Sequence, residues 1–409
     1  MRKTWRMLAV LLAAFALAAG GSIAFADPGP GGGGNSGSSG EQRGGDDDGV
    51  DHDADDDRGG HSGDDDGANH DADDDRDQDE AGDDRGSHTG DRKRAAKVYT
   101  LAEPQHGNPE GIAVDKRHGT FFVSATGDGA IYRGRIGDTS TPVPVFIPGA
   151  SGQAATGLKY HRGKLYVAGA GTGTIKVYDA TAGTLLATFD TTGGSGAPTF
   201  VNDLAVTRRG DVYATDSFRP AIYHLSAEEI AAGTPAPKPI NPADVIATQP
   251  EIPFDATAGT FNVNGIVVEP GRPDALIVVE AKTGRLFRVV VDGTARTITE
   301  ITVTGGPFPG GDGLLIDRGR LLVVQGNADG FANGVIDVIK LRSHGKRAKL
   351  VSRLTDASLK GPSTIARARN RYLVVNADFA TSTTPFTVSS LQRQGDDHRG
   401  RGRHKSGHH

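Results

Sequence analysis

The sequence GIAVD at residues 111–115, followed after a short turn by TFFVS at 120–124, is one copy of the pattern that decides the fold. Each copy is a short apolar strand that begins at a small or polar residue, then a turn, then a second apolar strand. The pattern occurs six times in the chain of 409 residues. The first strands are GIAVD (111–115), GLKYH (157–161), DLAVT (203–207), GIVVE (265–269), GLLID (313–317) and TIARA (364–368).

The second strands have the same character and lie at 120–124, 164–168, 211–215, 275–279, 320–324 and 371–375. Third strands follow most of them, β-branched and aromatic residues dominate, and Gly, Asp or Pro stands at the ends. A repeated unit of four short antiparallel strands is a propeller blade. The sequence therefore predicts an all-β, six-bladed β-propeller over residues 98–391. The strand VYTLA at 98–102 has no partner in the first repeat, and we expect it to close the ring in the sixth blade.

The residues on either side of the repeats have the composition of targeting and low-complexity segments. Residues 1–26 resemble a secretory signal peptide, with a positively charged start, an apolar run and a small-residue cleavage pattern at 24–26. Residues 27–97 hold 23 Asp and Glu against 8 Lys and Arg, with almost no apolar side chains, so we expect this acidic segment to be disordered. The Arg- and His-rich tail at 392–409 carries the same expectation. The sequence thus predicts a secreted, extracellular monomer, flanked by disordered tails and without a membrane span.

The composition also excludes several kinds of chemistry. The chain contains no cysteine, so disulfides, cysteine nucleophiles and thiolate metal sites are absent. The motif Gly-x-Ser-x-Gly is missing, which gives no support to a serine hydrolase. Basic residues are scattered along the repeats rather than grouped in a stripe, so the sequence predicts no nucleic-acid partner.

Polar residues stand just before the first strands, which line the central channel of a propeller. These positions converge at one end of the channel because every first strand starts on the same face. Two carboxylates and two carboxamides among them supply the oxygen donors that calcium prefers, so the sequence predicts a divalent metal there, with calcium favoured. A hydrogen-bonded polar plug without an ion is the alternative. The six residues are Glu110, Thr156, Asn202, Asn264, Asp312 and Ser363.

Short motifs at the same positions resemble the senescence marker protein (regucalcin)/gluconolactonase/luciferin-regenerating enzyme family of six-bladed propellers. The resemblance implies that Glu110, Asn264 and Asp312 hold a divalent metal and that Asn202 contacts substrate. It also implies hydrolysis of a lactone or ester, with Asp312 as the catalytic general base. The motifs are PEG (109–111), ND (202–203), NG (264–265) and GDGL (311–314).

Polar residues at the ends of the second strands are expected to support this site, and they are Asp216, Glu280, Gln325 and Asn376. The predicted function is a secreted metal-dependent hydrolase of the lactonase or esterase type that acts on a small-molecule substrate. The alternative is a non-catalytic extracellular propeller that binds a protein, a peptide or a glycan. Such a binding module has no need of Glu110 and Asp312 together, so the carboxylate pair favours the hydrolase.

Overall fold

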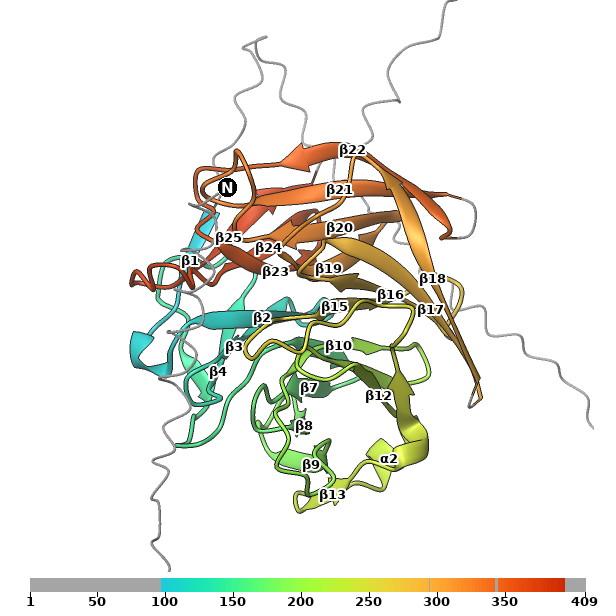
Figure 1. The fold of residues 1–409 in the computed structure, drawn as a ribbon. Helices are drawn as coiled ribbons and strands as arrows, with labels where there is room; N and C mark the ends of the chain where they lie inside the picture. Colours follow the sequence, from blue (N-terminus) through green and yellow to red (C-terminus); the bar gives the residue numbers. More distant parts are fainter. Residues whose placement is uncertain (1–96, 294, 343–344, 394–409) are drawn as a thin grey trace, which may run out of the picture. The chain divides into compact units, whose positions relative to one another are not determined.

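The computed structural model describes residues 97–293, 295–342 and 345–393, which form an all-β, propeller-like fold (Figure 1). The expected signal peptide lies outside these residues, as do the acidic segment apart from Lys97 and the C-terminal tail apart from Gln392 and Arg393. Lys97 and Gln392 are strand residues, so the sheets extend one residue beyond each end of the predicted range. None of the helices in the described ranges is long and apolar enough to cross a membrane.

The first three repeats form three separate sheets, and the strands of each repeat pair in chain order. The first sheet contains β2 (Pro109–Asp115), β3 (Thr120–Ala125), β4 (Ile131–Arg135) and β5 (Val145–Ile147). The second contains β6 (Leu158–His161), β7 (Lys164–Ala168), β8 (Thr174–Asp179) and β9 (Leu185–Asp190). The third contains β10 (Val201–Val206), β11 (Val212–Asp216), β12 (Ala221–Leu225) and β14 (Val245–Ala247).

The fourth and fifth repeats are joined into one eight-stranded sheet. Its two antiparallel halves meet where β18 and β22 pair in parallel, with Thr302, Val303 and Thr304 opposite Arg347, Ala348 and Lys349. The first half contains β15 (Val263–Val268), β16 (Ala275–Glu280), β17 (Arg285–Asp292) and β18 (Ala295–Thr304). The second contains β19 (Gly311–Asp317), β20 (Arg320–Gln325), β21 (Val335–Arg342) and β22 (Arg347–Leu354).

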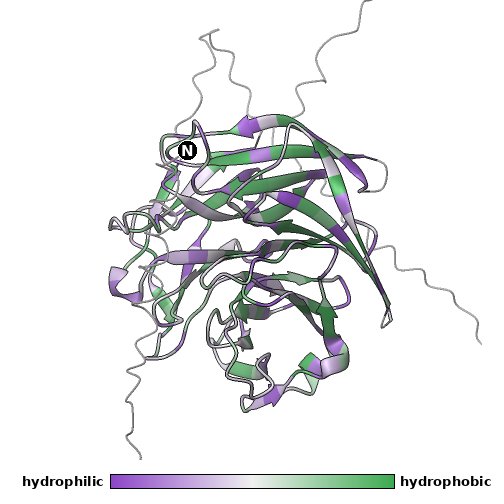
Figure 2. Ribbon diagram, in the orientation of Figure 1, coloured by the Kyte–Doolittle hydropathy of each residue, from purple (hydrophilic) through white to green (hydrophobic). Residues whose placement is uncertain are grey.

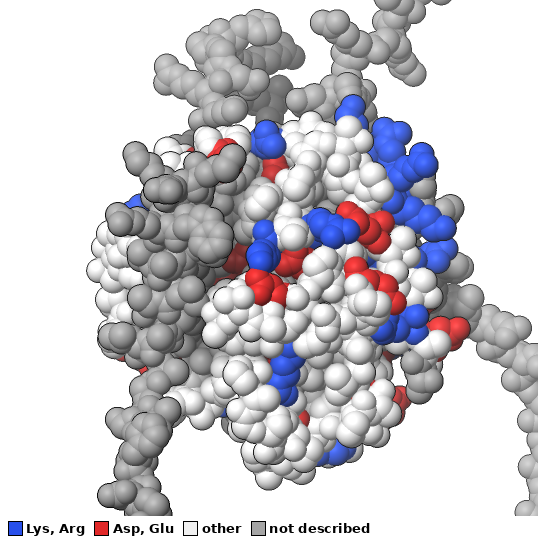
Figure 3. Space-filling model, viewed as in Figure 1, with Lys and Arg blue, Asp and Glu red and all other residues white. Residues whose placement is uncertain are grey.

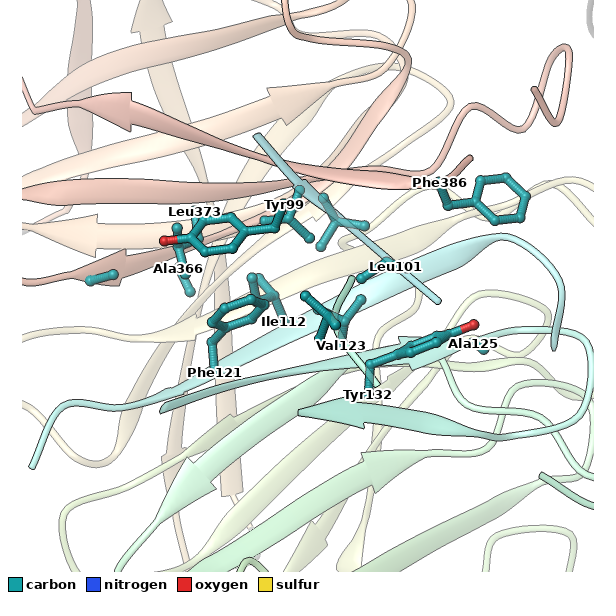
Figure 4. Packing of buried hydrophobic residues seen from close by; sticks show 14 of the residues in the cluster. Tyr99, Leu101, Ile112, Phe121, Val123, Ala125, Tyr132, Ala366, Leu373 and Phe386 are labelled. Atoms are coloured by element: carbon teal, nitrogen blue, oxygen red, sulfur yellow. The ribbon is translucent and has the colours of Figure 1, made fainter. Parts of the chain in front are cut away.

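The last sheet combines the two ends of the described chain. The N-terminal strand β1 (Lys97–Thr100) pairs antiparallel with β25 (Thr387–Gln392), which continues into β24 (Arg371–Asn376) and β23 (Pro362–Ala368). Tyr99 and the adjoining Leu101 are each only 2% exposed. Both pack in a cluster with residues of the first sheet such as Ile112 and Phe121, and the Tyr99 and Phe121 rings meet edge to face (Figure 4). The start of the folded region therefore packs between the last and the first sheets.

The long connection between β12 and β14 of the third sheet, residues 226–244, is mostly structured. Ser226 caps the short helix α2 (Ala227–Ala231) through a capping box with Glu229, which satisfies backbone N–H groups at the helix start. The chain then adds β13 (Pro237–Pro239) in parallel to β9 of the second sheet. After the 3-10 turn Pro242–Asp244, β14 returns as the outer strand of the third sheet. The connection thus serves two neighbouring sheets. A second 3-10 turn, Pro104–His106, follows β1.

Hydrophobic side chains concentrate on the strands (Figure 2) and pack between neighbouring sheets. The strand that opens each repeat is called a first strand here, and these are β2, β6, β10, β15, β19 and β23. Each contacts the first strand of the next repeat, and β23 contacts β2. The residues at the starts of the first strands are therefore brought close together.

Five first strands carry a β-bulge near their start. In β2, residues 109 and 112 face 125 and 123 of β3, so the first strand holds one extra residue between these pairs. The same one-residue shift occurs in β10, β15, β19 and β23. Bulges change the direction in which side chains project and are frequent next to functional sites. The bulged residues include Glu110, Asn202, Asn264, Asp312 and Ser363.

A glycine in the bulge permits the close approach of adjacent first strands. A Cβ added at Gly265 would collide with the carbonyl oxygen of Asp312, and one at Gly111 would collide with that of Thr156. Backbone atoms cannot rotate away as a side chain can, so any larger residue at these positions must push two strands apart.

Gly265→Ala is therefore expected to destabilise the fold by about 1–3 kcal/mol, because the new methyl group overpacks a strand interface. Urea unfolding measures the loss. Gly196→Ala is the matched control, since a Cβ at that position meets nothing within 4 Å. Equal stability of the two variants would show that the first strands are not closely packed at the bulge.

Candidate functional site

The bulges bring carboxylates from three repeats close enough to interact electrostatically. Glu110 of β2 is 5% exposed and Asp203 of β10 is 4% exposed, whereas Asp312 of β19 is partly exposed. The charges of Asp312 and Asp203 each raise the pKa of Glu110, and the charge of Asp203 raises the pKa of Asp312. We call these three residues the carboxylate cluster. Two of them, Glu110 and Asp312, were predicted from the sequence to lie together.

Asn264 joins the cluster from β15. It is 8% exposed, and its side chain forms a hydrogen bond with Asp312. Because a carboxylate accepts, the Asn264 amide nitrogen donates this bond. The structure therefore brings together Glu110, Asn264 and Asp312, the three residues expected to hold a metal.

Two buried oxygens of this group have no hydrogen-bond partner among the described residues: Oε2 of Glu110 and Oδ1 of Asn264. A buried acceptor without a donor costs about 1–3 kcal/mol, and more if it is charged. A cation supplies what such oxygens lack. A hard divalent ion, which takes carboxylate and amide oxygens, fits the donor set.

The carboxyl groups also repel one another. Burial raises the pKa of Glu110 well above its usual range, and the nearby Asp312 and Asp203 raise this pKa further, against an opposing effect of Lys159. Burial, followed by the charge of Asp203, raises the pKa of Asp312 to about 8, although the hydrogen bond from Asn264 lowers it. Asp312 therefore holds a proton at neutral pH unless a positive charge compensates its carboxylate.

Lys159 on β6 supplies one positive charge. Its Nζ donates to Oδ1 of Asp203 at 2.5 Å, and the backbone N–H of Leu204 donates to the same oxygen at 2.8 Å. Asp203 is thus held by a lysine and a backbone amide, and Lys159 acts on Glu110 without a recorded hydrogen bond to it. Among the described residues, Glu110 and Asp312 are therefore the cluster carboxyls without a direct hydrogen bond from a lysine or arginine.

Sequence reasoning missed both Asp203 and Lys159. Asp203 occupies the position that is Gly111, Gly157, Gly265 or Gly313 in four other repeats. A carboxylate in place of a repeated glycine was a visible signal, because the glycine position faces the crowded junction of first strands. Comparing the repeats position by position would have found it.

The other residues that precede first strands tie neighbouring strands together. Asn202 is 3% exposed and donates to Oγ of Ser217 at 2.8 Å, and Ser217 donates to the carbonyl of Val263. Thr156 donates to the carbonyl of Val201 at 2.9 Å. Ser363 donates to the carbonyl of Glu110 at 2.7 Å. These bonds fix the positions of the bulges that carry the cluster.

The four residues expected to support the site from the ends of the second strands stabilise turns and loops. Among the described residues, none of them forms a recorded hydrogen bond with the carboxylate cluster. The Asp216 carboxylate accepts from the backbone N–H of Phe200 and Phe218 and from Tyr223. That of Glu280 accepts from the N–H of Lys282 and Thr283. Gln325 donates to the carbonyl of Pro309, and Asn376 bonds Lys360, Ser358, Thr387 and Ser389.

The described ranges hold no group of three or more His, Cys, Asp and Glu side chains arranged to hold a metal. Any metal at the cluster must therefore use an amide oxygen beside the carboxylates. Asn264, with its unpartnered oxygen, is the residue that provides one.

Comparison with known proteins identifies the fold. No protein-family model matches the sequence, and no curated protein matches it. Among solved structures, a gluconolactonase from Xanthomonas campestris superposes with a TM-score of 0.50 at 16% identity, covering 73% of this chain and 90% of that chain. A luciferin-regenerating enzyme gives 0.50 at 13% identity over 73% and 95% of the two chains. A calcium-binding regucalcin from Agrobacterium tumefaciens gives 0.48 at 16%, over 73% and 93%.

This chain shares the fold of the gluconolactonase and the luciferin-regenerating enzyme. The resemblance that the short motifs predicted is thus confirmed at the level of the fold.

The raised pKa values predict how stability depends on pH when metal is removed. Folded Asp312, with a pKa of about 8, binds its proton more tightly than the unfolded chain, where the value is 3.8. The contribution of Asp312 to the free energy of unfolding is fully present below its unfolded pKa of 3.8. It is lost as the pH rises through its folded pKa of about 8. In the presence of chelator, the melting temperature should therefore fall between about pH 5 and pH 8.

Circular dichroism melts at several pH values measure this dependence. Asp312→Asn should flatten it, since the carboxamide does not titrate. An identical pH slope in the variant and the wild type would show that Asp312 does not hold a proton in the folded state.

Proposed function

We propose that this chain is a secreted, monomeric, metal-dependent hydrolase of the lactonase or esterase type, active where its first strands begin. The proposed frame is a six-bladed propeller in which the eight-stranded sheet counts as two blades and β1 completes the last. Contacts from each first strand to the next, including β23 to β2, support this count. The observation that carries the function is the pair of buried, unpartnered oxygens on Glu110 and Asn264 beside Asp312.

Glu110, Asn264 and Asp312 would hold the ion, and calcium is proposed because every donor is an oxygen. When bound, a divalent cation polarises a carbonyl and stabilises the negative charge that develops on its oxygen. Asp312 is proposed to accept the proton of the attacking water, and the adjacent Asn202 to contact the substrate. Lys159 holds the Asp203 carboxylate in place, because it donates directly to that group.

The substrate class is proposed from the shared fold together with the cluster. One similar structure is a gluconolactonase, which supports a small-molecule lactone or ester as the substrate. Structures at this low sequence identity share the fold, but a shared fold does not determine the reaction. The proposal therefore rests on the residues of the carboxylate cluster.

Thermal melting with and without chelator tests whether the protein binds a metal ion. Calcium, magnesium, manganese and zinc should each be added to the chelated protein, and a binding ion should raise the melting temperature in proportion to its occupancy. Hydrolysis of δ-gluconolactone and of p-nitrophenyl acetate is measured under the same conditions.

A melt that no ion shifts, together with no hydrolysis, would identify the cluster as a polar plug. The extracellular binding module would then be the better function. A metal shift without hydrolysis of either substrate would retain the metal site and remove the proposed reaction.

A further inference from the structure

Four basic side chains form a compact array on one face of the β21–β22 hairpin. Lys340 lies directly opposite Lys349, and Arg342 lies directly opposite Arg347. All four are exposed, whereas the alternating residues Leu341, Ala348 and Leu350 pack into the core. We call Lys340, Arg342, Arg347 and Lys349 the cation array. Figure 3 shows Lys and Arg gathered on the side of the molecule where this hairpin lies in Figure 1.

The array places like charges opposite each other twice in succession. Like charges in directly paired positions of a sheet destabilise it. For residues 295–342 and 345–353, the structure records no ion pair or side-chain hydrogen bond for any member of the array. The hairpin therefore carries a repulsion that the fold itself does not relieve.

The carboxylates on β18 and on the strands of the array already form ion pairs with other arginines. Glu300, which lies along β18 beyond Thr302, bonds Arg285, and Asp337 on β21 bonds Arg353 at 2.9 Å. The positions beside the array on β18 are the exposed hydroxyls of Thr302 and Thr304, opposite Arg347 and Lys349. The surface thus offers four free cations and two neutral hydrogen-bonding groups, and no free acid on the three strands.

We propose that the cation array binds a linear anionic polysaccharide through its sulfate or phosphate groups. Paired side chains lie about 4.5–5.5 Å apart across strands. Residues two apart on one strand are separated by about 6.6–6.8 Å. Each oxyanion can therefore contact an opposing pair, and the next group along a polymer can contact the second pair.

The chemistry of the face favours a glycan over a nucleic acid. Proteins that hold single-stranded nucleic acid combine a basic groove with aromatic side chains on which bases stack. The array and its β18 neighbours contain Lys, Arg and Thr, with no aromatic side chain among these six residues. Threonine hydroxyls suit the hydroxyl groups of a sugar backbone. The full chain has a net charge of −6, so retention by a polyanion requires a local site of this kind.

The test is binding of heparin, a sulfated polysaccharide, to the full chain and to the double variant Arg342→Gln, Arg347→Gln. The matched control is Arg208→Gln, Arg209→Gln, which removes the same charge from two exposed arginines in the β10–β11 turn. Titration should show an affinity for heparin at least about tenfold lower in the array variant, because two of the four cations that contact the polyanion are removed. The control should remain within about twofold of the wild type.

A second readout does not depend on heparin. Removing one opposing pair relieves repulsion, so the array variant should melt about one to two degrees higher than the wild type, whereas the control should not. Equal heparin affinity in the array variant and the wild type would overturn the proposal. Tighter binding of a thymidine oligonucleotide than of heparin would overturn the glycan assignment in favour of a nucleic acid.

Discussion

Asp312→Asn is expected to abolish hydrolysis of lactones and esters, with a loss of about 10²–10⁴-fold in kcat even at saturating metal. The carboxamide keeps the shape of the side chain but cannot accept the proton of the attacking water. The same change removes a carboxyl that burial and Asp203 already force toward its protonated form. The chelated variant should therefore be at least as stable as the wild type while its activity is lost.

The measurement is steady-state hydrolysis together with thermal melting. Glu110→Gln should weaken metal binding by about 1 kcal/mol or more, because it removes one charge-assisted contact, and should recover part of its activity at high metal concentration. Asp292→Asn, at an exposed position, is the matched control and should behave as the wild type. Activity in Asp312→Asn within about threefold of the wild type would contradict the role of Asp312 as base.

The double variant Tyr99→Ala, Leu101→Ala is expected to lose about 5–8 kcal/mol of unfolding free energy, enough to unfold many domains. Both side chains are 2% exposed, and the Tyr99 hydroxyl also accepts the backbone N–H of Gly137 at 2.8 Å. The truncation leaves a cavity between the first and last sheets.

Val98→Ala is the matched control on the same strand, because Val98 is 38% exposed and should cost less than about 0.5 kcal/mol. Urea unfolding monitored by circular dichroism compares the variants. A double variant as stable as the control would show that β1 contributes no core packing and that the ends of the folded chain are not joined through it.

The strands could be predicted from the sequence because their hydrophobic pattern repeats. The second strand predicted at 211–215 appears as Val212–Asp216. The repeat has no signal for pairing between repeats, so the junction of β18 with β22 and the addition of β13 to β9 could not be foreseen. These pairings depend on where edges meet in space.

The candidate site was predicted in part for the same reason. Glu110, Asn264 and Asp312 occupy equivalent positions of the repeat, so periodicity was enough to bring them together. The replacement of a repeated glycine by Asp203 is visible in the sequence, but its effect on the pKa of Glu110 and of Asp312 depends on the contact between first strands. The bulges also escaped prediction, since an extra residue in one strand is visible only when its partner's register is known.

The parallel junction of β18 and β22 has a consequence for how the molecule opens. Each of these strands would otherwise be the outer edge of its own sheet, with unpaired N–H and C=O groups available to another chain. Their pairing removes two such edges at once and couples the fourth and fifth repeats into one hydrogen-bonded body. These two repeats should exchange their amide protons as a single cooperative unit, while the sheets that end in a free outer strand open one at a time.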